Sequence, residues 1–366
     1  MIVCHVTCAH RYNDGRIFQK ECRSLSRAGY EVVLVAPGIN RVEDGVRVIG
    51  IGDTPSSTLK RVTLSAYKAY KAALDVRADI YHLHDPELLP YAKRLKCQGF
   101  KVIFDNHENV LETFSDKQVI PSFLRNMAGK SFVNYAGNIF SKLDALVTVT
   151  PAIVEQLSPW NSKTVLVTNY PELIKFEDKI TNKEERTICF TGNINDIWSI
   201  KHVVDSMADT NNIRFVLCGF TTDDYLNRLK QSPGWKKCEY LGLLSSQEAK
   251  KVQQSSTVGL ALVSYNKYFF YKEGSLGNTK IYEYMMKGLP VICTDVNVWK
   301  EMVEKYHCGV CVNPTDKKTL VNAIDFLMDN PDMAAEMGRN GRKAVENEYN
   351  WKTQEKVLLD LYSSLK

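Results

Sequence analysis

Short apolar runs alternate along the chain with longer stretches whose apolar residues recur at helical spacing. In the first half, the runs that predict strands are IVCHVT from Ile2, EVVLVAP from Glu31, GVRVIGI from Gly45, DIYHLHD from Asp79, KVIFD from Lys101, ALVTVT from Ala145 and TVLVTNYPE from Thr164. Helical stripes separate many of them, such as Phe18, Cys22 and Leu25 within residues 16–28. Strands that alternate with helices predict an α/β protein with parallel sheets.

The alternation is interrupted once. Residues 174–186 are charged and show no periodicity, so they predict a linker between two domains. The pattern restarts with TICFTGN from Thr187, RFVLCG from Arg214, EYLGLL from Glu239, VGLALV from Val258 and CGVCV from Cys308. The length of 366 residues also suits two domains. In open α/β sheets, ligands bind outside the carboxyl ends of the strands, so polar residues at those ends are the first candidates for a site.

Residues 273–295, EGSLGNTKIYEYMMKGLPVICTD, predict a loop, a helix and a strand. Asn278 is suited to cap the helix, and Gly288 and Pro290 are suited to end it. A glycine-bearing loop before a helix presents free backbone N–H groups and the positive end of the helix dipole, which suits a phosphate. Glu283, one turn into the helix, would then reach a ribose. A surface pair with Lys287 is the alternative, and the residues alone favour it slightly.

Composition narrows the function classes only a little. The 44% apolar and 24% charged content is that of a soluble globular protein, and no block of like charge suggests nucleic-acid binding. The net charge of +5 suits an anionic ligand or lipid surface, and the basic stretch 58–76 is either a solvated face or a peripheral contact with the inner face of the cell membrane. The chain start resembles a strand rather than a signal peptide, and no apolar run of about 18 residues occurs, so we expect a cytoplasmic protein.

Neither the cysteines nor the histidines predict a metal. Most of the ten cysteines lie in apolar segments, and the Cys308-x-x-Cys311 pair has no second pair beside it. His82 and His84 would share one face of a strand, but a metal site needs a third ligand and the sequence makes none evident. No G-x-G-x-x-G follows the first strand, which argues against a nicotinamide-dependent dehydrogenase.

Three segments resemble the family-four glycosyltransferases. The stretch NTKIYEYMMKGLPVI is similar to their donor-nucleotide segment, while DGRIFQKECRSLSRAGYEVVLVAP and YHLHDPELLPYAKRLKCQGFKVIFDNHE are similar to the acceptor domain of bacterial members. The resemblance implies the GT-B fold: Rossmann-like domains over residues 1–172 and 173–348 that face a cleft, and a last helix, 349–366, that packs back on the first domain. It further implies a retaining hexosyl- or acetylhexosaminyltransferase of polysaccharide biosynthesis that needs no metal or other cofactor.

The resemblance also assigns a donor site. Glu283 matches the family's ribose-binding Glu, whereas a second Glu, common in the family eight positions earlier, is Ser275 here. The family usually has Arg or Lys just after the glycine matched by Gly192 and again a few residues later, where this chain has Asn193 and Trp198. The positive charge that stabilises the leaving diphosphate is therefore expected from Lys280 or Lys201. For Lys201, a solvated helix position is an equally good interpretation. The expected donor-binding residues are Gly192, Asn193, Lys201, Leu243, Gly277, Asn278, Thr279, Lys280 and Glu283.

His107 lies two residues after the end of the predicted strand KVIFD. It matches the family's histidine that reaches the donor sugar, and it is the expected catalytic residue. The expected acceptor-binding residues are His10, Asp14, Arg16, His84 and Asp85. For Asp14, a helix cap is an equally good interpretation.

We expect a UDP-, GDP- or ADP-sugar as donor and a saccharide or lipid-linked saccharide as acceptor, and no nucleic acid. Two alternatives stay open, a sugar-nucleotide epimerase of the same fold and a non-catalytic nucleotide-sugar-binding subunit. The missing basic residues after Gly192 support the second.

Overall fold

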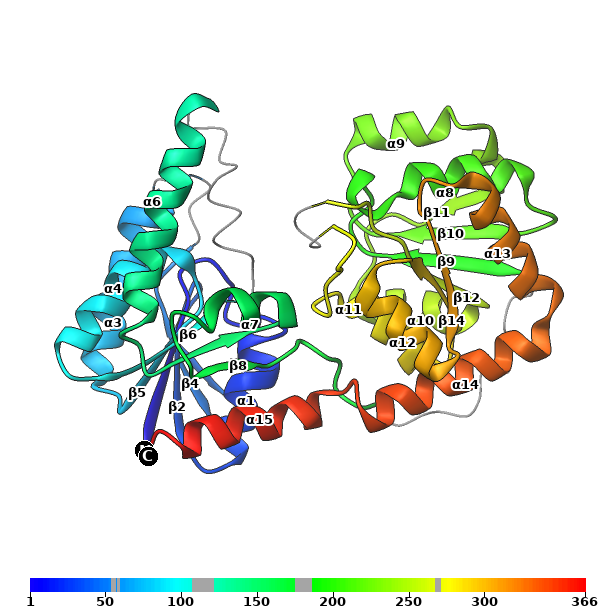
Figure 1. Ribbon diagram of the computed structural model, residues 1–366. Helices are drawn as coiled ribbons and strands as arrows, with labels where there is room; N and C mark the ends of the chain where they lie inside the picture. The colour runs from blue at the N-terminus through cyan, green and yellow to red at the C-terminus, as the bar shows by residue number, and fades with distance from the viewer. Residues whose placement is uncertain (54–56, 58–59, 107–121, 175–185, 267–270) are drawn as a thin grey trace. The chain divides into compact units, whose positions relative to one another are not determined.

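The computed structural model describes residues 1–53, 57, 60–106, 122–174, 186–266 and 271–366. The chain divides into two compact units, Met1–Asn169 with Trp351–Lys366, and Tyr170–Asn350 (Figure 1). The expected linker lies almost wholly outside the described residues. The last helix, α15 (Trp351–Ser363), belongs to the first unit, because Trp351, Leu358 and Tyr362 lie in its core.

The first unit is a sheet of eight strands in the order β3-β4-β2-β1-β5-β6-β7-β8, in which only β3 runs antiparallel to its neighbour. Its strands are β1 Ile2–Val6, β2 Glu31–Ala36, β3 Arg41–Glu43, β4 Val46–Gly50, β5 Ile80–Leu83, β6 Lys101–Asn106, β7 Ala145–Thr148 and β8 Thr164–Leu166. Most of the central strand residues are buried on both faces, as their continuous apolar runs predict for a sheet covered on both sides.

Helices cover both faces of this sheet (Figure 1). In chain order they are the π-helical η1 Ile17–Cys22, α1 Arg23–Arg27, the π-helical η2 Arg61–Ser65, α3 Ala66–Val76, η3 Pro86–Leu88, α4 Leu89–Cys97, α6 Ser122–Phe140 and α7 Pro151–Leu157. Phe18 and Cys22 of η1 and Leu25 of α1 pack with α15 on one face, over Val3, Val32 and Leu34. The stripe predicted within residues 16–28 is therefore a core face, although its first part winds as a π-helix.

The second unit has six parallel strands in the order β11-β10-β9-β12-β13-β14. They are β9 Thr187–Thr191, β10 Arg214–Cys218, β11 Cys238–Tyr240, β12 Val258–Ala261, β13 Val291–Thr294 and β14 Gly309–Val312. The helices are η4 Asp196–Trp198, α8 Ile200–Ser206, η5 Met207–Asp209, α9 Asp223–Lys230, η6 Pro233–Lys237, α10 Ser246–Ser255, α11 Thr279–Met286, α12 Asn297–Tyr306, α13 Lys317–Asp329 and α14 Pro331–Asn347.

Two apolar cores cover the two faces of this second sheet. One contains Ile200 of α8, Leu229 of α9 and Ile324 of α13, and the other contains Tyr284 of α11 and Trp299 of α12. The prediction of an α/β protein built from two parallel-sheet domains is thus confirmed. No helix among the described residues is both long and apolar enough to span a bilayer.

Helix α11 begins and ends as its sequence predicts. The side chain of Asn278 caps it by accepting a hydrogen bond from the Lys280 N–H at 3.1 Å. Gly288 has a positive φ of 68°, which a glycine adopts without steric cost, and the chain then continues into β13. The apolar face, including Ile281, Tyr284 and Met285, is fully buried. The start of α11 is thereby fixed at the carboxyl edge of the second sheet.

Candidate functional site

The strand orders single out one position on each sheet. In the first sheet, the strands that follow β1 in the chain lie on one side of it, and β5 starts a second run of strands on its other side. In the second sheet, β9 and β12 stand in the same relation: β10 and β11 lie on one side of β9, and β12 starts the run on the other side. At such a switch point the connections diverge and leave a crevice outside the carboxyl ends of the strands. The expected acceptor residues cluster near the first of these positions, and the expected donor residues near the second.

Glycines line the carboxyl end of β9. Gly192 has a φ of 140°, and its N–H donates to the Cys218 carbonyl at 2.9 Å. A Cβ on Gly192 would lie 2.4 Å from the Lys280 Nζ, so this glycine leaves the space that the lysine occupies. A Cβ on Gly219, which follows β10, would lie 1.8 Å from the Gly192 carbonyl oxygen. Both positions therefore require glycine, and they keep the backbone at this edge bare.

Lys280 is the cation at this edge. Its Nζ lies 4.5 Å from the centroid of the Trp198 ring and 5.7 Å from that of Phe190, both suitable cation–π distances. Burial lowers the pKa of Lys280, and the nearby Glu283 carboxylate partly offsets that shift. Within the described residues, Lys280 forms no ion pair. The sequence left Lys280 and Lys201 as candidates, and the structure brings Lys280 to Gly192, whereas Lys201 bonds both oxygens of Asp205 at 2.7 and 2.8 Å.

The loop before α11 is held by local bonds. Ser275 is buried; its hydroxyl accepts from the Gly277 N–H at 3.1 Å, and its carbonyl accepts from the Trp299 indole N–H at 3.1 Å. The Asn278 Nδ2 is buried and has no hydrogen-bond partner among the described residues. Thr279, Lys280 and Glu283 are half-buried. The loop therefore presents an unsatisfied amide donor beside the half-buried lysine.

Exposed apolar side chains follow β10 and β11. Leu243 is 75% exposed, Phe220 58% and Leu241 38%. Asn193 is exposed as well. Such a concentration of exposed apolar groups near one sheet edge is suited to a flat apolar ligand such as a nucleobase. Phe220 was not among the expected donor contacts, and its place directly after the strand-like run RFVLCG was the sequence signal for it.

At the first sheet the expected acceptor residues are engaged by the protein itself. The Asp85 carboxylate accepts from the Thr7 hydroxyl at 2.9 Å and from the Cys8 and Ala9 N–H groups, so it fixes the loop after β1. Asp85 is 2% exposed. His10 is the more accessible residue, with ring nitrogens 3.5 Å from Asp85 and 3.5 Å from Asp14.

Arg16 and Asp14 have structural partners too. The Arg16 Nε donates to Asp105 at 2.8 Å and its Nη1 donates to the Val167 carbonyl at 2.8 Å, in a position that is only 5% exposed. Asp14 accepts from the N–H groups of Arg16 and Ile17 at 2.8 and 2.9 Å, which is the helix-cap interpretation. Burial alone would raise the pKa of Asp14, but its hydrogen bonds from His10 and these N–H groups hold it well below its usual value.

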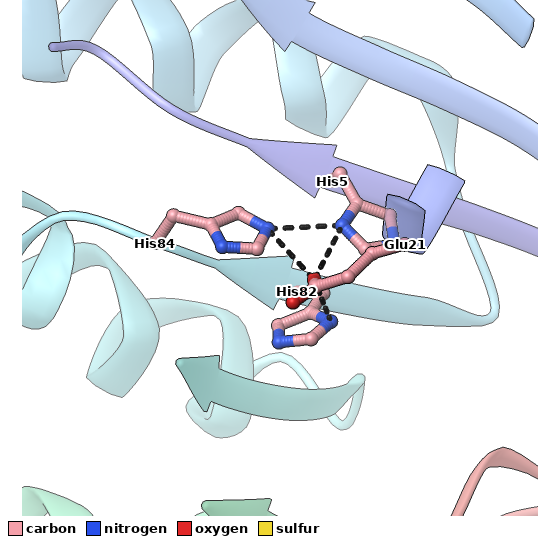
Figure 2. Close-up of side chains that lie close together, drawn as sticks. All are labelled: His5, Glu21, His82 and His84. Atoms are coloured by element: carbon pink, nitrogen blue, oxygen red, sulfur yellow. Dashed lines mark hydrogen bonds and ion pairs between the residues drawn. The ribbon is translucent and has the colours of Figure 1, made fainter. Parts of the chain in front are cut away.

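Beneath this edge lies a buried group that the sequence reasoning missed. His5 of β1, Glu21 of η1, His82 of β5 and His84 directly after β5 direct their side chains toward one another, and Figure 2 shows the three rings around the Glu21 carboxylate. His5 pairs in register with His82, which brings β1 beside β5. The argument that His82 and His84 lack a third ligand is therefore wrong. Histidines at equivalent places in two predicted strands were the available signal.

Burial dominates the electrostatics of this group. It lowers the pKa of His5 and of His82 well below the usual value, so both imidazoles are neutral. It raises the pKa of Glu21, against the opposing attraction of Arg16. His84, which is 1% exposed, bonds His5 at 2.9 Å and Asp105 at 3.3 Å. An acceptor sugar has no direct access to His84 in this arrangement.

Two family models match the chain. The model for glycosyl transferases group 1 matches residues 172–344, and the glycosyl transferase 4-like domain matches residues 15–169. The chain is a glycosyltransferase of the GT-B fold.

Solved structures share this fold at low sequence identity. Sucrose-phosphate synthase from Thermosynechococcus elongatus is 18% identical, with a TM-score of 0.75 over 100% of this glycosyltransferase and 98% of that chain. A glycosyltransferase from Rickettsia africae is 14% identical, with a TM-score of 0.75 over 100% and 98%. Anabaena Alr3699/HepE, crystallised with UDP-glucose, is 12% identical, with a TM-score of 0.71 over 100% of both chains. No curated protein matches this glycosyltransferase by sequence.

The expected catalytic residue cannot be placed on this geometry. His107 lies outside the described residues, which end on this side at Asn106, the last residue of β6. Asn106 is 2% exposed, and its carbonyl accepts from the Thr148 hydroxyl at 3.1 Å. The role of His107 in the glycosyltransferase stays a prediction.

Proposed function

We propose that the glycosyltransferase moves a hexosyl or acetylhexosaminyl group from a UDP-sugar to a hydroxyl of a glycan or lipid-linked glycan, with retention of the anomeric configuration. One observation carries the donor assignment: Lys280, half-buried and without an ion pair among the described residues, lies against Gly192 at the start of α11. Burial of this ammonium has a cost that the nearby Glu283 carboxylate offsets only in part, and an anionic ligand would offset the rest.

The diphosphate of the donor fits this edge chemically. The Asn278 amide and the Lys280 ammonium are donors, the positive end of the α11 dipole favours an anion, and the bare backbone at Gly192 permits close approach. The nucleoside would extend toward Leu243 and Phe220, with its ribose hydroxyls on Glu283. UDP as the nucleotide is supported by the Anabaena neighbour, which was crystallised with UDP-glucose.

The proposed reaction breaks the bond between the sugar carbon and the diphosphate oxygen and forms a bond from the same carbon to the acceptor oxygen. Negative charge grows on the departing diphosphate, and groups already in place to stabilise it lower the barrier. In our proposal Lys280 and the α11 N–H groups do so, the leaving phosphate oxygen takes the acceptor proton, and His107 contacts the donor sugar. Added Mg²⁺ or Mn²⁺ should then leave kcat/KM unchanged.

A peripheral contact with an anionic membrane would bring a lipid-linked acceptor to the enzyme. On η2 and α3, the exposed apolar residues Val62, Leu64 and Tyr67 lie among the exposed Lys68 and Lys71, and the exposed Lys60 directly precedes η2. This combination suits a lipid surface with acidic headgroups. Cosedimentation with phosphatidylglycerol vesicles, and not with phosphatidylcholine vesicles, is the expected result, and Leu64→Glu should weaken it.

The donor assignment is tested by thermal unfolding with UDP-, GDP- and ADP-glucose. A ligand at about 100 times its Kd adds roughly 2.7 kcal/mol to stability, so UDP-glucose should raise the Tm clearly and the other two should not. An equal shift with all three would contradict the base preference. Consumption of UDP-sugar only when an acceptor is present would exclude an epimerase, and proton NMR of the product gives its anomeric configuration.

A further inference from the structure

The buried group of His5, Glu21, His82 and His84 has no part in the proposed transfer, and its geometry is that of a metal site. One ligand atom from each residue lies within 4.8 Å of every other. The Glu21 Oε2 is 3.9 Å from the His5 Nδ1, 3.9 Å from the His84 Nε2 and 4.0 Å from the His82 Nδ1. All four residues are at most 1% exposed.

The distances leave the carboxylate without a hydrogen bond. Separations of 3.9 to 4.0 Å are too long for one. The Oε1 lies 3.0 Å from the Arg16 Nε, but without hydrogen-bond geometry, and neither Glu21 oxygen has a hydrogen-bond partner among the described residues. Most buried carboxylate oxygens do have such partners. Glu21 is thus a buried acceptor directed into a ring of imidazoles that do not reach it.

The charges in this region call for one more positive group. Two buried carboxylates, Asp105 and Glu21, face the single guanidinium of Arg16, which bonds Asp105 in a fork at 2.8 and 3.2 Å. A proton on Glu21, shared with the neighbouring Asp105 carboxylate, would also balance the charge, and the metal content of the protein distinguishes these two possibilities. A divalent cation at the centre of the four side chains would more than offset the net charge of −1 and would contact every ligand atom.

We propose that these four side chains bind one Zn²⁺ ion in a closed tetrahedral site. With Zn–N and Zn–O bonds of about 2.0–2.2 Å, the edges of a tetrahedron are about 3.3 Å long. The edges from Glu21 to the three histidines are 3.9 to 4.0 Å, the edge between His5 and His84 is 2.9 Å, and no edge exceeds 4.8 Å, so shifts of up to about 1.5 Å per edge complete the site. Imidazole nitrogens with one carboxylate are a ligand set that zinc accepts.

The second nitrogens of two rings already have the partners that ligating histidines need. The His84 Nδ1 lies 3.3 Å from the Asp105 carboxylate, and the His5 Nε2 lies 3.3 Å from the Tyr362 hydroxyl. A hydrogen bond from the outer N–H of a ligating histidine fixes its tautomer and orientation. The His82 Nδ1 is bonded to the same Tyr362 hydroxyl at 2.8 Å. Zinc would replace that bond, while the bond between the Tyr362 hydroxyl and the His5 Nε2 would remain.

Such a site would be structural. All four positions are protein ligands and none is accessible, whereas a catalytic zinc keeps one position for water or substrate. The ion would join β1, β5 and η1, and through Tyr362 also α15, which comes from the other end of the chain. It would lie beneath the loop that Asp85 holds, and it is independent of the donor site in the second unit.

Metal content and a cobalt spectrum test this proposal. The full-length wild type, expressed in minimal medium with Zn²⁺ or Co²⁺ and desalted, should retain about one ion per chain, the single site that the four ligands define. The cobalt form should show the visible ligand-field bands of tetrahedral nitrogen and oxygen coordination. A thiolate charge-transfer band would instead locate the ion at cysteines such as Cys293 and Cys311, whose sulfurs are 3.6 Å apart, and would overturn the proposal. Absence of retained metal would overturn it too.

Matched variants identify the ligands. His82→Gln and Glu21→Gln should reduce retained zinc to the background level, while His202→Gln, a histidine on α8 of the other unit, should retain it. Full retention by His82→Gln would contradict the proposal. If the ligand variants do not fold, the wild-type cobalt spectrum decides. As a readout apart from metal content, unfolding in urea with a chelator should occur at a lower midpoint than unfolding with free Zn²⁺, because a ligand that binds only the folded state stabilises it.

Discussion

The two units share a parallel sheet with a switch point, but they fill the carboxyl edge of that sheet differently. In the first unit, the edge is occupied by buried charged and polar side chains that bond one another, such as Arg16 with Asp105 and Asp85 with the loop after β1. In the second unit, glycines keep the edge bare, Lys280 has no ion pair among the described residues, and Leu243 is exposed. The first arrangement is stable by itself, whereas in our proposal the second is completed by the donor. Substitutions at the first edge should therefore affect folding, and those at the second should affect donor use.

The largest effect is expected for Arg16→Met. It leaves the Asp105 carboxylate buried without its guanidinium, and breaking a buried pair in this way costs about 3–5 kcal/mol. Urea unfolding followed by circular dichroism measures this loss. If the variant were as stable as the wild type and only its KM for the acceptor were raised, Arg16 would be an acceptor contact and not a structural residue of the first edge.

Lys280→Met should reduce kcat/KM with little change in stability. Removing one preorganised donor from a site of developing charge costs about 2.7–4 kcal/mol, or roughly 100- to 1,000-fold in rate. Steady-state kinetics with UDP-sugar measures the effect, and Lys300→Ala, an exposed lysine on α12, is the control. Lys201→Ala discriminates between the two lysines, because its partner Asp205 predicts little change in rate. A large loss for Lys201→Ala with normal rates for Lys280→Met would exchange their roles.

Glu283→Ala is expected to raise the KM for the donor and leave kcat nearly unchanged. Hydrogen bonds from a charged group contribute about 1.5–3 kcal/mol, which corresponds to roughly 10- to 150-fold. Glu283→Gln should have a smaller effect because the amide oxygen still accepts. Unchanged donor kinetics in both variants would refute the ribose role and leave a surface position.

Leu243→Ala tests the exposed apolar group at the second edge. Its stability should stay within about 0.5 kcal/mol of the wild type, since surface substitutions rarely do more. The donor KM should rise by roughly fivefold at most, the loss of about 1 kcal/mol of apolar contact. Equilibrium unfolding measures the change in stability, and donor titration measures the change in KM. A large loss of stability would show that Leu243 belongs to the core of the second unit.

The smallest effect concerns pH. The pKa of Lys280 in the folded state lies below its ordinary value of 10.5 because of burial. The unfolded state therefore holds this proton to higher pH, and stability rises as the pH increases from the folded pKa to the unfolded one. In urea unfolding, the wild type should gain stability relative to Lys280→Met as the pH rises toward 10.5. A parallel pH dependence for both proteins would show that the ammonium is well solvated.

The sequence by itself determined the local features that depend on neighbouring residues. Asn278 caps α11 and Gly288 ends it as predicted, because cap and turn chemistry acts within one helical turn. Continuous apolar runs likewise identified the buried strands, and three separated segments carried the resemblance to a glycosyltransferase.

The tertiary structure alone decided which side chains meet. Lys280 reaches Gly192 because α11 starts beside β9. Lys201 does not, because it pairs with Asp205 one turn further along its own helix, α8. His5 joins His82 and His84 because β1 pairs with β5 across 77 positions of sequence, and the π-helical η1 brings in Glu21. Such contacts depend on strand order and on burial, which no short stretch of sequence specifies.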